Sequence, residues 1–435
     1  MIPVVGTYSE RMSKFPNFIL AAGALAALTG CDFHFGASGG WLTGDLSAAT
    51  NFSQTASIPS DLSNLEVDNA NGSVRVTGVA GGAPGWTWKL AVRARSDDAA
   101  RRIASSVNCK TELADGRLKL VVTVSAIAEP HSIQSDFEIT VPKSASILSK
   151  TSFGRTDLLG IGGNVDAADQ NGEMDIRNTA GTVRARTSFA TLALSATGAA
   201  TVENQNGAID ATHIGGALEA ETSFAPMLAQ DVLGPAVLAN QNGEIKANAI
   251  YGPLTAKTSF AAINVYDIGG PVRLRDQNGS VEAVRVKGGA DIKTSFDGLS
   301  VEEIGGDAVL ANQNGGIFAN AVTGAVKAAT SFAAIEIKGA GTEFVCHNQN
   351  GAIRLRATSA ALARIEAETS FDILEVHLPA KAGPAIVAKT TFGKVESDFP
   401  LLPPRDGTDV FADTAPGVPR ATLHNQNGNI RVYRD

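Results

Sequence analysis

The chain has 435 residues, a formal net charge of −8 and only 6% aromatic residues. It contains no basic run and no aromatic set of the kind found in RNA-binding motifs, so the composition argues against a nucleic-acid partner. After residue 30, no apolar stretch is long enough to span a bilayer.

Residues 1–30 have the features of a lipoprotein signal peptide. Lys14 supplies a short basic region, and the apolar run from Phe18 to Leu28 is too short for a membrane span. The sequence LTGC that ends at Cys31 resembles a bacterial lipobox, which implies cleavage before Cys31 and acylation of its thiol. Two or three acyl chains would then hold the protein on a membrane, because each buried methylene contributes about 0.8 kcal/mol.

Residues 31–60 are rich in glycine, serine, threonine and alanine, which predicts a flexible tether. Asp32 follows the acylated cysteine and resembles an inner-membrane retention signal, but the choice between inner and outer membrane stays open. Residues 61–150 are expected to open the folded domain with longer strands and a short helix. Ser96 would cap that helix, because acidic residues follow it in the first turn.

Two triplets alternate along residues 151–398. Thr-Ser-Phe begins at residues 151, 187, 222, 258, 294, 330 and 369. Gln-Asn-Gly begins at residues 170, 205, 241, 277, 313, 349 and, after a gap, 426. Glycines fall midway between the triplets at a spacing of 17 to 19 residues. The unit is therefore about 18 residues long, in two versions that turn a corner with TSF or with QNG.

Between the triplets the apolar residues alternate, as Val281 and Ala283 do after one QNG. A period of two predicts short strands with one buried face. Two short strands and two corners cannot bury a face alone, but stacked coils can. We therefore predict an all-β fold, a parallel β-solenoid of either hand. Cys109 and Cys346 are expected to be buried free thiols, although a disulfide between them stays open.

The alternation predicts how the corners pack. TSF of one coil is expected to lie over QNG of the next, so that phenylalanine and glycine share a column, as do serine and asparagine. Glycine lacks a Cβ atom, allows a bend at positive φ and leaves room for the ring. The predicted structural corner residues are Phe189, Gly207, Phe224, Gly243, Phe260, Gly279, Phe296, Gly315, Phe332 and Gly351.

Residues 399–435 are expected to form a proline-rich loop followed by a terminal QNG coil. The loop would cover the open end of the stack, which a solenoid must protect from pairing with other chains.

The order of these motifs resembles a known family. An NG corner at Asn71-Gly72, a strand of the form F.I.VP over residues 137–142, and many coils of the form [SN][GF]xx[IVL]x[VAL] follow one another. They are similar to the bacterial putative-adhesin domain, a β-strand-repeat domain related to Toastrack-type envelope domains. The resemblance covers about residues 61–435 and implies a β-solenoid secreted or anchored at the envelope, without implying an activity.

Residues suited to catalysis or metal binding are spread along the chain. None of the six histidines belongs to a close ligand set. His347 and His424 each lie two residues before a QNG and could form a metal site in neighbouring coils, but exposed polar residues are the better explanation. Asp169 and Asp276 stand where other coils carry asparagine, which favours a corner-capping role.

The most charged patch consists of Arg273, Arg275, Asp276, Arg285 and Lys287. Parallel β-helices that cleave polysaccharides need acidic residues clustered with Arg or Lys on one outer face. An enzymatic alternative, a polysaccharide lyase or hydrolase, would use such a groove, whereas a solvated face is the simpler interpretation. No catalytic residue, cofactor or metal site is predicted.

The sequence thus favours a non-catalytic protein of the bacterial cell envelope, on the periplasmic or the outer-surface side. The N-terminal lipid would attach the protein to the membrane. Its solenoid face would act as an adhesin-like binding or scaffolding surface for a glycan or an envelope protein. The Toastrack resemblance adds envelope-stress sensing as an alternative. The ligand and the oligomeric state stay open.

Overall fold

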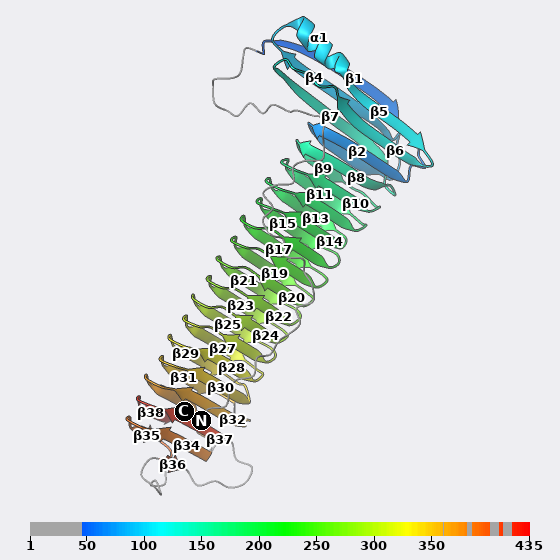
Figure 1. Ribbon diagram of the computed structural model, residues 1–435. Helices are drawn as coiled ribbons and strands as arrows, with labels where there is room; N and C mark the ends of the chain where they lie inside the picture. Colours follow the sequence, from blue (N-terminus) through cyan, green and yellow to red (C-terminus); the bar gives the residue numbers. More distant parts are fainter. Residues whose placement is uncertain (1–45, 360, 381–384, 401–408, 412–419) are drawn as a thin grey trace.

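The protein is a long rod of stacked strands with a broader block at its N-terminal end (Figure 1). The computed structural model describes residues 46–359, 361–380, 385–400, 409–411 and 420–435. Within these residues the only helix is α1 (Asp97–Ser106), and the other elements are strands. No helix in this described part is long and apolar enough to cross a membrane. The predicted signal peptide and Cys31 lie outside the described residues.

The strands form two sheets that face each other across the core. Sheet A comprises β1 (Ala48–Ser57), β3 (Val74–Val79), β4 (Gly85–Ala94), β7 (His131–Pro142), β9 (Thr156–Leu159), β11 (Met174–Thr179), β13 (Leu192–Thr197), β15 (Ile209–Ile214), β17 (Met227–Val232), β19 (Ile245–Ile250), β21 (Ile263–Ile268), β23 (Val281–Val286), β25 (Leu299–Ile304), β27 (Ile317–Val322), β29 (Ile335–Gly339), β31 (Ile353–Ala357), β33 (Leu374–Leu378), β35 (Val395–Ser397) and β38 (Ile430–Arg434).

Sheet B comprises β2 (Asn64–Asn71), β5 (Val107–Ala114), β6 (Arg117–Val124), β8 (Ser146–Phe153), β10 (Val165–Asp169), β12 (Val183–Thr187), β14 (Ala200–Asn204), β16 (Leu218–Glu221), β18 (Ala236–Ala239), β20 (Leu254–Lys257), β22 (Val272–Arg275), β24 (Ala290–Lys293), β26 (Ala308–Ala311), β28 (Val326–Thr330), β30 (Glu343–Asn348), β32 (Arg364–Thr369), β34 (Ala385–Thr390), β36 (Asp409–Phe411) and β37 (Arg420–Asn425).

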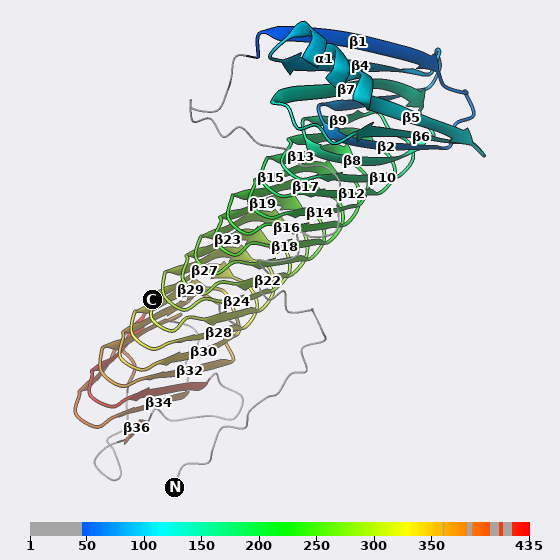
Figure 2. The same ribbon diagram turned by 45° about the horizontal axis from the view of Figure 1, so that its top comes forward.

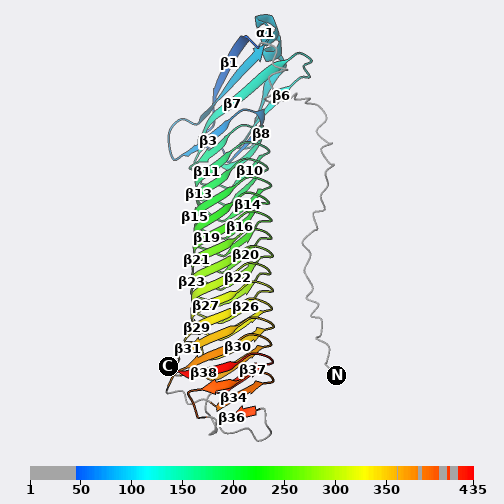
Figure 3. The ribbon, with the colours of Figure 1, turned by 90° about the vertical axis from the view of Figure 1, so that its left-hand side faces the viewer.

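Along the rod each coil contributes one strand to each sheet, and neighbouring coils pair in parallel (Figures 1 and 3). Ala200 of β14, for example, lies opposite Leu218 of β16, which is 18 residues further along the chain. The next strands, β15 and β17, repeat the arrangement in sheet A. The predicted parallel β-solenoid of about 18-residue coils is therefore confirmed.

The alternation of side chains builds the core between the sheets. Ile263 and Val265 of β21 are fully buried, whereas Asn264 between them faces outward. Cys346 is buried in the same way, which confirms it as a core residue with a free thiol. Cys109 is also a free thiol, but it lies in β5 of the N-terminal block and is only half-buried.

The second corner, where the chain returns from sheet A to sheet B, depends on a left-handed residue in most coils. Nine non-glycine residues stacked in this column have φ between 53° and 58°, and they are Asn178, Ala196, His213, Asp231, Ala249, Asp267, Arg285, Glu303 and Ala321. The left-handed residue interrupts the strand alternation, so the following residue, such as Ile268 after Asp267, turns into the core. The sequence patterns gave no sign of this column.

The N-terminal block begins earlier than expected. β1 pairs antiparallel with β4 over ten positions, from Ala48 opposite Ala94 to Ser57 opposite Gly85. The predicted tether over residues 31–60 is therefore wrong from residue 48 onward. Its small polar residues suit an edge strand as well as a linker. Among the described strands only β4 pairs with β1, and the side chains of β1 are mostly exposed. The helix follows Ser96 as predicted, and the Ser96 side chain accepts a hydrogen bond from the Ala99 N–H.

Both ends of the rod contain a coil inserted out of chain order, and Figure 2 shows the N-terminal one, with β2 between β6 and β8. At the N-terminal end, β2 lies between β6 and β8, and β3 lies between β7 and β9. At the other end, β37 lies between β32 and β34, and β38 lies between β33 and β35. Figure 3 shows the red C-terminal strands between orange ones.

The predicted terminal coil is thus not the last coil of the stack. In the described part of the chain, the last long strand of sheet B is β34. The short strand β36 pairs with it in the antiparallel direction, with Phe411 opposite Val387. One piece of the proline-rich segment therefore does cover the end of the sheet. The insertion also restores the alternation of triplets, because Gln426 lies between Thr369 and Thr391, bonded to both through the backbone.

Candidate functional site

The corner that leads from sheet B to sheet A carries the TSF and QNG triplets, but not in the expected register. Thr187 lies opposite Asn204, the residue before QNG, and Thr330 lies opposite Asn348 in the same way. Continuing this register pairs serine with glutamine and phenylalanine with the asparagine of QNG. The pairing of Phe153 with Asn71 shows this column directly. The predicted Phe–Gly and Ser–Asn columns are therefore wrong by one residue.

The inner column of the corner is a buried ladder of threonine alternating with asparagine or aspartate. The Asn204 side chain donates to the Ala190 carbonyl at 2.8 Å and accepts from the Gly207 N–H at 2.9 Å. In the next coil the Thr222 hydroxyl donates to the Gly207 carbonyl at 3.0 Å. These bonds satisfy backbone groups where the chain leaves the strand. The predicted corner-capping role is confirmed for Asp169 too, which accepts from the Gly172 N–H at 2.8 Å.

Glycine ends the QNG triplet for a reason other than the expected one. A Cβ atom on Gly207 would lie 2.1 Å from the Ala190 carbonyl oxygen of the neighbouring coil. The same short approach recurs in the other QNG corners, at 2.3 Å for Gly279 and Ala261. Glycine is therefore needed because two backbones approach closely, whereas a positive φ is not found at these glycines.

The phenylalanines project from the corner into solvent. Phe189, Phe224, Phe260, Phe296, Phe332, Phe371 and Phe392 are each between 60% and 76% exposed. The expectation that they fill the corner is wrong, because the chain bends over each of these triplets, as it does at residues 188–190, and directs the ring outward. We call this row of seven side chains the Phe edge.

The Phe edge has a regular spacing and is built from uncharged triplets. One asparagine lies between successive rings, so rings recur every second coil, about 9.5 Å apart at the strand spacing of a sheet. The asparagine amides donate to the serine carbonyls of the neighbouring coil, as Asn278 does to Ser259 at 2.8 Å. The glutamines of the QNG triplets, such as Gln241, are mostly exposed beside the rings. The triplets themselves contain no charged residue.

The insertion at the C-terminal end preserves this spacing. Thr369 and Thr390 both pair with Asn425, from opposite sides. Phe371 and Phe392 consequently lie two coils apart, with Asn427 between them. Without the inserted coil these two rings would lie in adjacent coils.

Two other surfaces have a distinct character. An open groove of 580 Å³ runs along the second corner and is lined by Tyr251, Asp267, Arg285 and Lys287, among others. Arg285 donates two hydrogen bonds to Asp267, at 2.6 and 2.9 Å, and this contact lowers the pKa of the Asp267 carboxyl. The charges in the groove are thus partly paired with each other.

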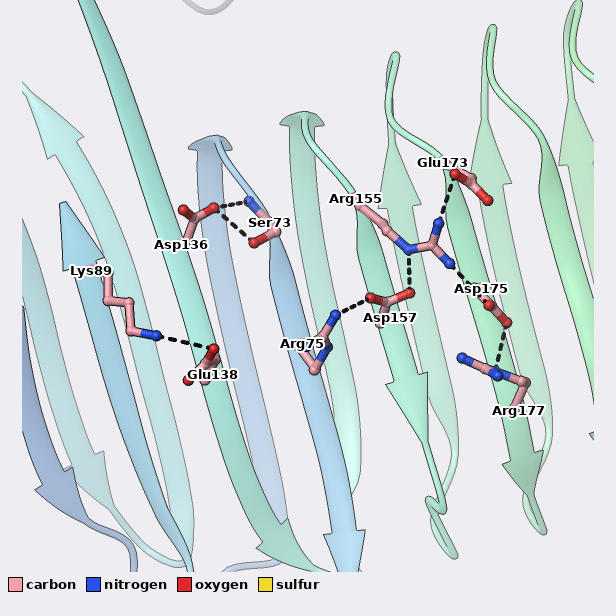
Figure 4. Close-up of polar contacts among 10 residues, drawn as sticks. All are labelled: Ser73, Arg75, Lys89, Asp136, Glu138, Arg155, Asp157, Glu173, Asp175 and Arg177. Atoms are coloured by element: carbon pink, nitrogen blue, oxygen red, sulfur yellow. Dashed lines mark hydrogen bonds and ion pairs between the residues drawn. The ribbon is translucent and has the colours of Figure 1, made fainter. Parts of the chain in front are cut away.

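On the outer face of sheet A near the N-terminal block, Arg155 joins three carboxylates of two coils (Figure 4). It contacts Asp157 at 2.6 Å, Glu173 at 2.8 Å and Asp175 at 3.1 Å, and hydrogen bonding to Asp157 raises the pKa of its guanidinium. Arg75 contacts Asp157 from the inserted β3 at 3.1 Å. This network connects the block to the rod.

The predicted charged patch does not form one site. Arg273 and Arg275 both contact Asp291 on sheet B, at 3.3 and 2.5 Å. Asp276 is buried in the corner ladder, and Arg285 lies at the second corner. Arg285 and Lys287 line the groove at the second corner without the other three, so the cluster that an enzymatic alternative would need is not assembled from these residues.

The two histidines before QNG triplets do come together. His347 and His424 lie on either side of Glu368, with Nδ1 to carboxylate-oxygen distances of 3.6 and 3.4 Å. The inserted β37 brings His424 to this place, which the distance along the chain could not reveal. Among the residues that the structure describes, no group of three or more metal-ligating side chains is found, so these contacts do not form a metal site there.

No protein-family model and no curated protein matches this chain. Solved structures with a detectable similarity include a putative adhesin from Parabacteroides merdae, 11% identical over 68% of this chain and 96% of that one, with a TM-score of 0.23. A putative adhesin from Parabacteroides distasonis is 12% identical over 68% of this chain and 97% of that one, with a TM-score of 0.21.

A third such structure is a putative cell adhesion protein from Clostridium sporogenes, 8% identical over 89% of this chain and all of that one, with a TM-score of 0.15. These neighbours carry the family name that the sequence resembles. At these identities and scores they establish nothing about what this chain binds.

Proposed function

We propose that the protein is a lipid-anchored, non-catalytic protein of the bacterial cell envelope. In this proposal the rod presents the Phe edge to a binding partner, in the manner of an adhesin. The observation that supports it is the row of seven phenylalanines, each at least 60% exposed, along one edge of the rod.

Exposure on this scale needs a reason. A large apolar side chain costs free energy in water, and contiguous exposed apolar patches generally mark interaction sites. A single exposed ring would need no explanation, but an exposed ring recurs in six of the seven TSF coils and again at Phe392. The fold does not require these rings for packing, because the core is filled by residues such as Ile263 and Leu274.

The charged residues support a non-catalytic role. Arg155, Arg285 and Arg354 each contact a carboxylate of a neighbouring coil, at 2.6 to 3.0 Å. Such pairs run along the rod and brace adjacent coils. Incubation with polyuronates tests the enzymatic alternative, because a lyase would release unsaturated products that absorb ultraviolet light, and their appearance would overturn the non-catalytic part.

Binding at the Phe edge is tested with isolated cell envelopes. The full chain carrying Cys31→Ser, which removes the acylated thiol, is compared with the same chain carrying Phe224→Ser, Phe260→Ser and Phe296→Ser. We expect this edge variant to lose at least tenfold in envelope binding.

A matched control replaces three exposed apolar residues outside the edge, Val237→Ser, Val309→Ser and Phe318→Ser. This control variant should bind envelopes as well as the Cys31→Ser chain with an unmutated Phe edge does. Equal binding by the edge variant and the parent chain would overturn the proposed site.

Lipid attachment and the side of the envelope on which the rod lies are tested in intact cells. Incorporation of labelled palmitate should be seen for the native chain and be lost with Cys31→Ser. Protease shaving of intact cells then separates the two locations. Digestion of the rod while periplasmic markers survive places it on the outer surface, where adhesion to other cells is open to it. Survival until the envelope is opened restricts it to an internal scaffolding or stress-sensing role.

A further inference from the structure

We infer that the partner of the Phe edge is a second copy of this chain, with two rods side by side along this edge. This inference rests on the proposed function, because it names the partner of the same surface. Three observations lead to it, namely the period of the rings, the area they expose and the lack of charge in the triplets that carry them.

A second rod has rings at the same spacing, and this match continues along the whole Phe edge. Rings stand about 9.5 Å apart with an asparagine between them, because they recur every second coil at the strand spacing. A ring of one rod can therefore lie over the asparagine level of the other, between two rings. Since both rods have the same repeat, a fit at one level is repeated at every other level. The inserted C-terminal coil extends this match to Phe392.

The exposed area is sufficient for a stable pair. A phenylalanine presents about 200 Å², so seven rings that are roughly three-fifths exposed offer about 800 Å² on each rod. A standard protein–protein interface buries about 800 Å² per partner. The serine, glutamine and asparagine side chains beside the rings add polar contact to this area.

The chemistry of the edge also suits a second copy. The chain has a net charge of −8, so two copies repel each other in general. The TSF and QNG triplets themselves carry no charge, so they can approach a second copy without opposing like charges, although the exposed Asp297 and Asp372 directly follow Phe296 and Phe371. The aromatic residue is phenylalanine throughout, which has no polar group to direct toward a sugar or a lipid headgroup.

Symmetry determines whether the two rods of the dimer run parallel or antiparallel. Homodimers are most often related by a twofold axis, which makes the same surface face itself. A twofold axis parallel to the rods would place equivalent rings at the same level, ring against ring. The rings of one rod can lie between those of the other only if the axis is perpendicular to the rods, and the two rods then run antiparallel. A pair of this kind would be as long as one rod and twice as thick.

The experiment measures self-association of the full chain carrying Cys31→Ser. Sedimentation velocity over a concentration series gives the mass, and small-angle X-ray scattering gives the length and the cross-section. We expect a monomer–dimer equilibrium in which the cross-section doubles and the length is unchanged. The edge variant Phe224→Ser, Phe260→Ser, Phe296→Ser should raise the dissociation constant by roughly a hundredfold or more. The control Val237→Ser, Val309→Ser, Phe318→Ser should leave it within about twofold.

A parent chain that stays monomeric throughout the series overturns the inference, as does equal weakening by the control. Envelopes from a strain that lacks this chain separate the two claims. Edge-dependent binding to such envelopes by a monomeric rod means that the proposed function stands and the partner is another molecule. If the rod dimerises through the Phe edge and binds envelopes that contain this chain but not envelopes that lack it, the partner is a second copy. Envelope binding that does not depend on the Phe edge overturns the proposed site whatever the oligomeric state.

Discussion

Asp276 occupies the same place in its corner as Asn312 does two coils further on, but the two side chains are satisfied differently. The Asn312 amide donates to the Asp297 carbonyl at 2.7 Å, and its oxygen accepts from the Gly315 N–H at 3.0 Å. Asp276 accepts the Gln277 N–H at 2.6 Å, while its Oδ2 atom is buried without a partner. An ionised carboxylate has no proton to donate where the amide of Asn312 donates one.

Asp276→Asn should therefore stabilise the protein at neutral pH. An unsatisfied buried polar atom costs about 1–3 kcal/mol, and the amide would remove most of that cost. Burial raises the pKa of the Asp276 carboxyl above 3.8, so the folded state favours the protonated form. The wild-type chain then loses stability as pH rises from 3.8 through the raised folded pKa. Urea midpoints should show a clear gain for the variant at pH 7 and little difference below pH 3.8.

Asp169→Asn is the matched control for this prediction. The Oδ2 atom of Asp169 accepts hydrogen bonds from the Thr151 and Thr156 hydroxyls, at 2.8 and 3.3 Å. Its carboxylate is already satisfied, so no gain is expected. An equal gain from both substitutions, or a gain for Asp276→Asn that does not change with pH, would contradict this account.

Gly279→Val should disrupt several coils around the corner. A Cβ atom at Gly279 would lie 2.3 Å from the Ala261 carbonyl oxygen, and backbone atoms cannot move aside as a flexible side chain can. Overpacking typically costs about 1–3 kcal/mol, and the short backbone approach places this substitution at the upper end of that range. Hydrogen exchange should accelerate in β22 to β25, and the melting temperature should fall.

Gly298→Val serves as the comparison, because a Cβ atom there meets nothing within 4 Å. Its melting temperature should change by much less. If the two variants melted together, close backbone approach would not be the reason for glycine in QNG.

The Cys346 thiol should be unreactive in the folded protein. Burial raises its pKa to about 12, and its side chain is fully buried in β30. Since only the thiolate reacts, an aromatic disulfide reagent at pH 8 should modify Cys346 no faster than the rod unfolds. The measurement uses Cys31→Ser with Cys109→Ser, so that one thiol remains, and guanidinium serves as the positive control. Rapid labelling without denaturant would show that the coil opens locally.

His377 should hold the C-terminal residue in a pH-dependent way. Its Nδ1 and Nε2 atoms lie 2.9 Å from an Asp435 oxygen and 3.0 Å from a Glu375 oxygen, respectively. Burial lowers the pKa of His377, but the hydrogen bonds to these carboxylates outweigh it and raise the pKa above 6.5. The contact is therefore complete below pH 6.5 and is lost as pH rises through the raised folded pKa.

Exchange of the Asp435 amide, which donates to the Leu378 carbonyl at 2.9 Å, reports on this contact. Relative to the intrinsic exchange rate, protection should fall between mildly acidic and alkaline pH, and His377→Gln should flatten the profile. His213→Gln, at an exposed histidine in mid-rod, should leave it unchanged. A profile that stays the same in His377→Gln would rule out the histidine as its cause.

The sequence by itself determined the coil. Alternating residues such as Val281 and Ala283 mark buried strand positions, and a fixed repeat of about 18 residues allows stacking in one register. Even the corner register can be read in this way, because Thr187 and Asn204 are each the third inward residue of their strands. Comparing triplet with triplet missed it, because TSF begins at the third inward residue whereas QNG begins one residue after it.

Only the tertiary structure decided what lies at the ends and what faces outward. The pairings of β37 with both β32 and β34, and of β2 with both β6 and β8, join segments far apart in the chain, and no local pattern encodes them. The outward direction of Phe189 follows from where the backbone turns, whereas hydrophobicity alone would place the ring inside. Local periodicity encodes which residues share a face of a strand, but the path of the chain between strands determines which coils become neighbours and which rings reach solvent.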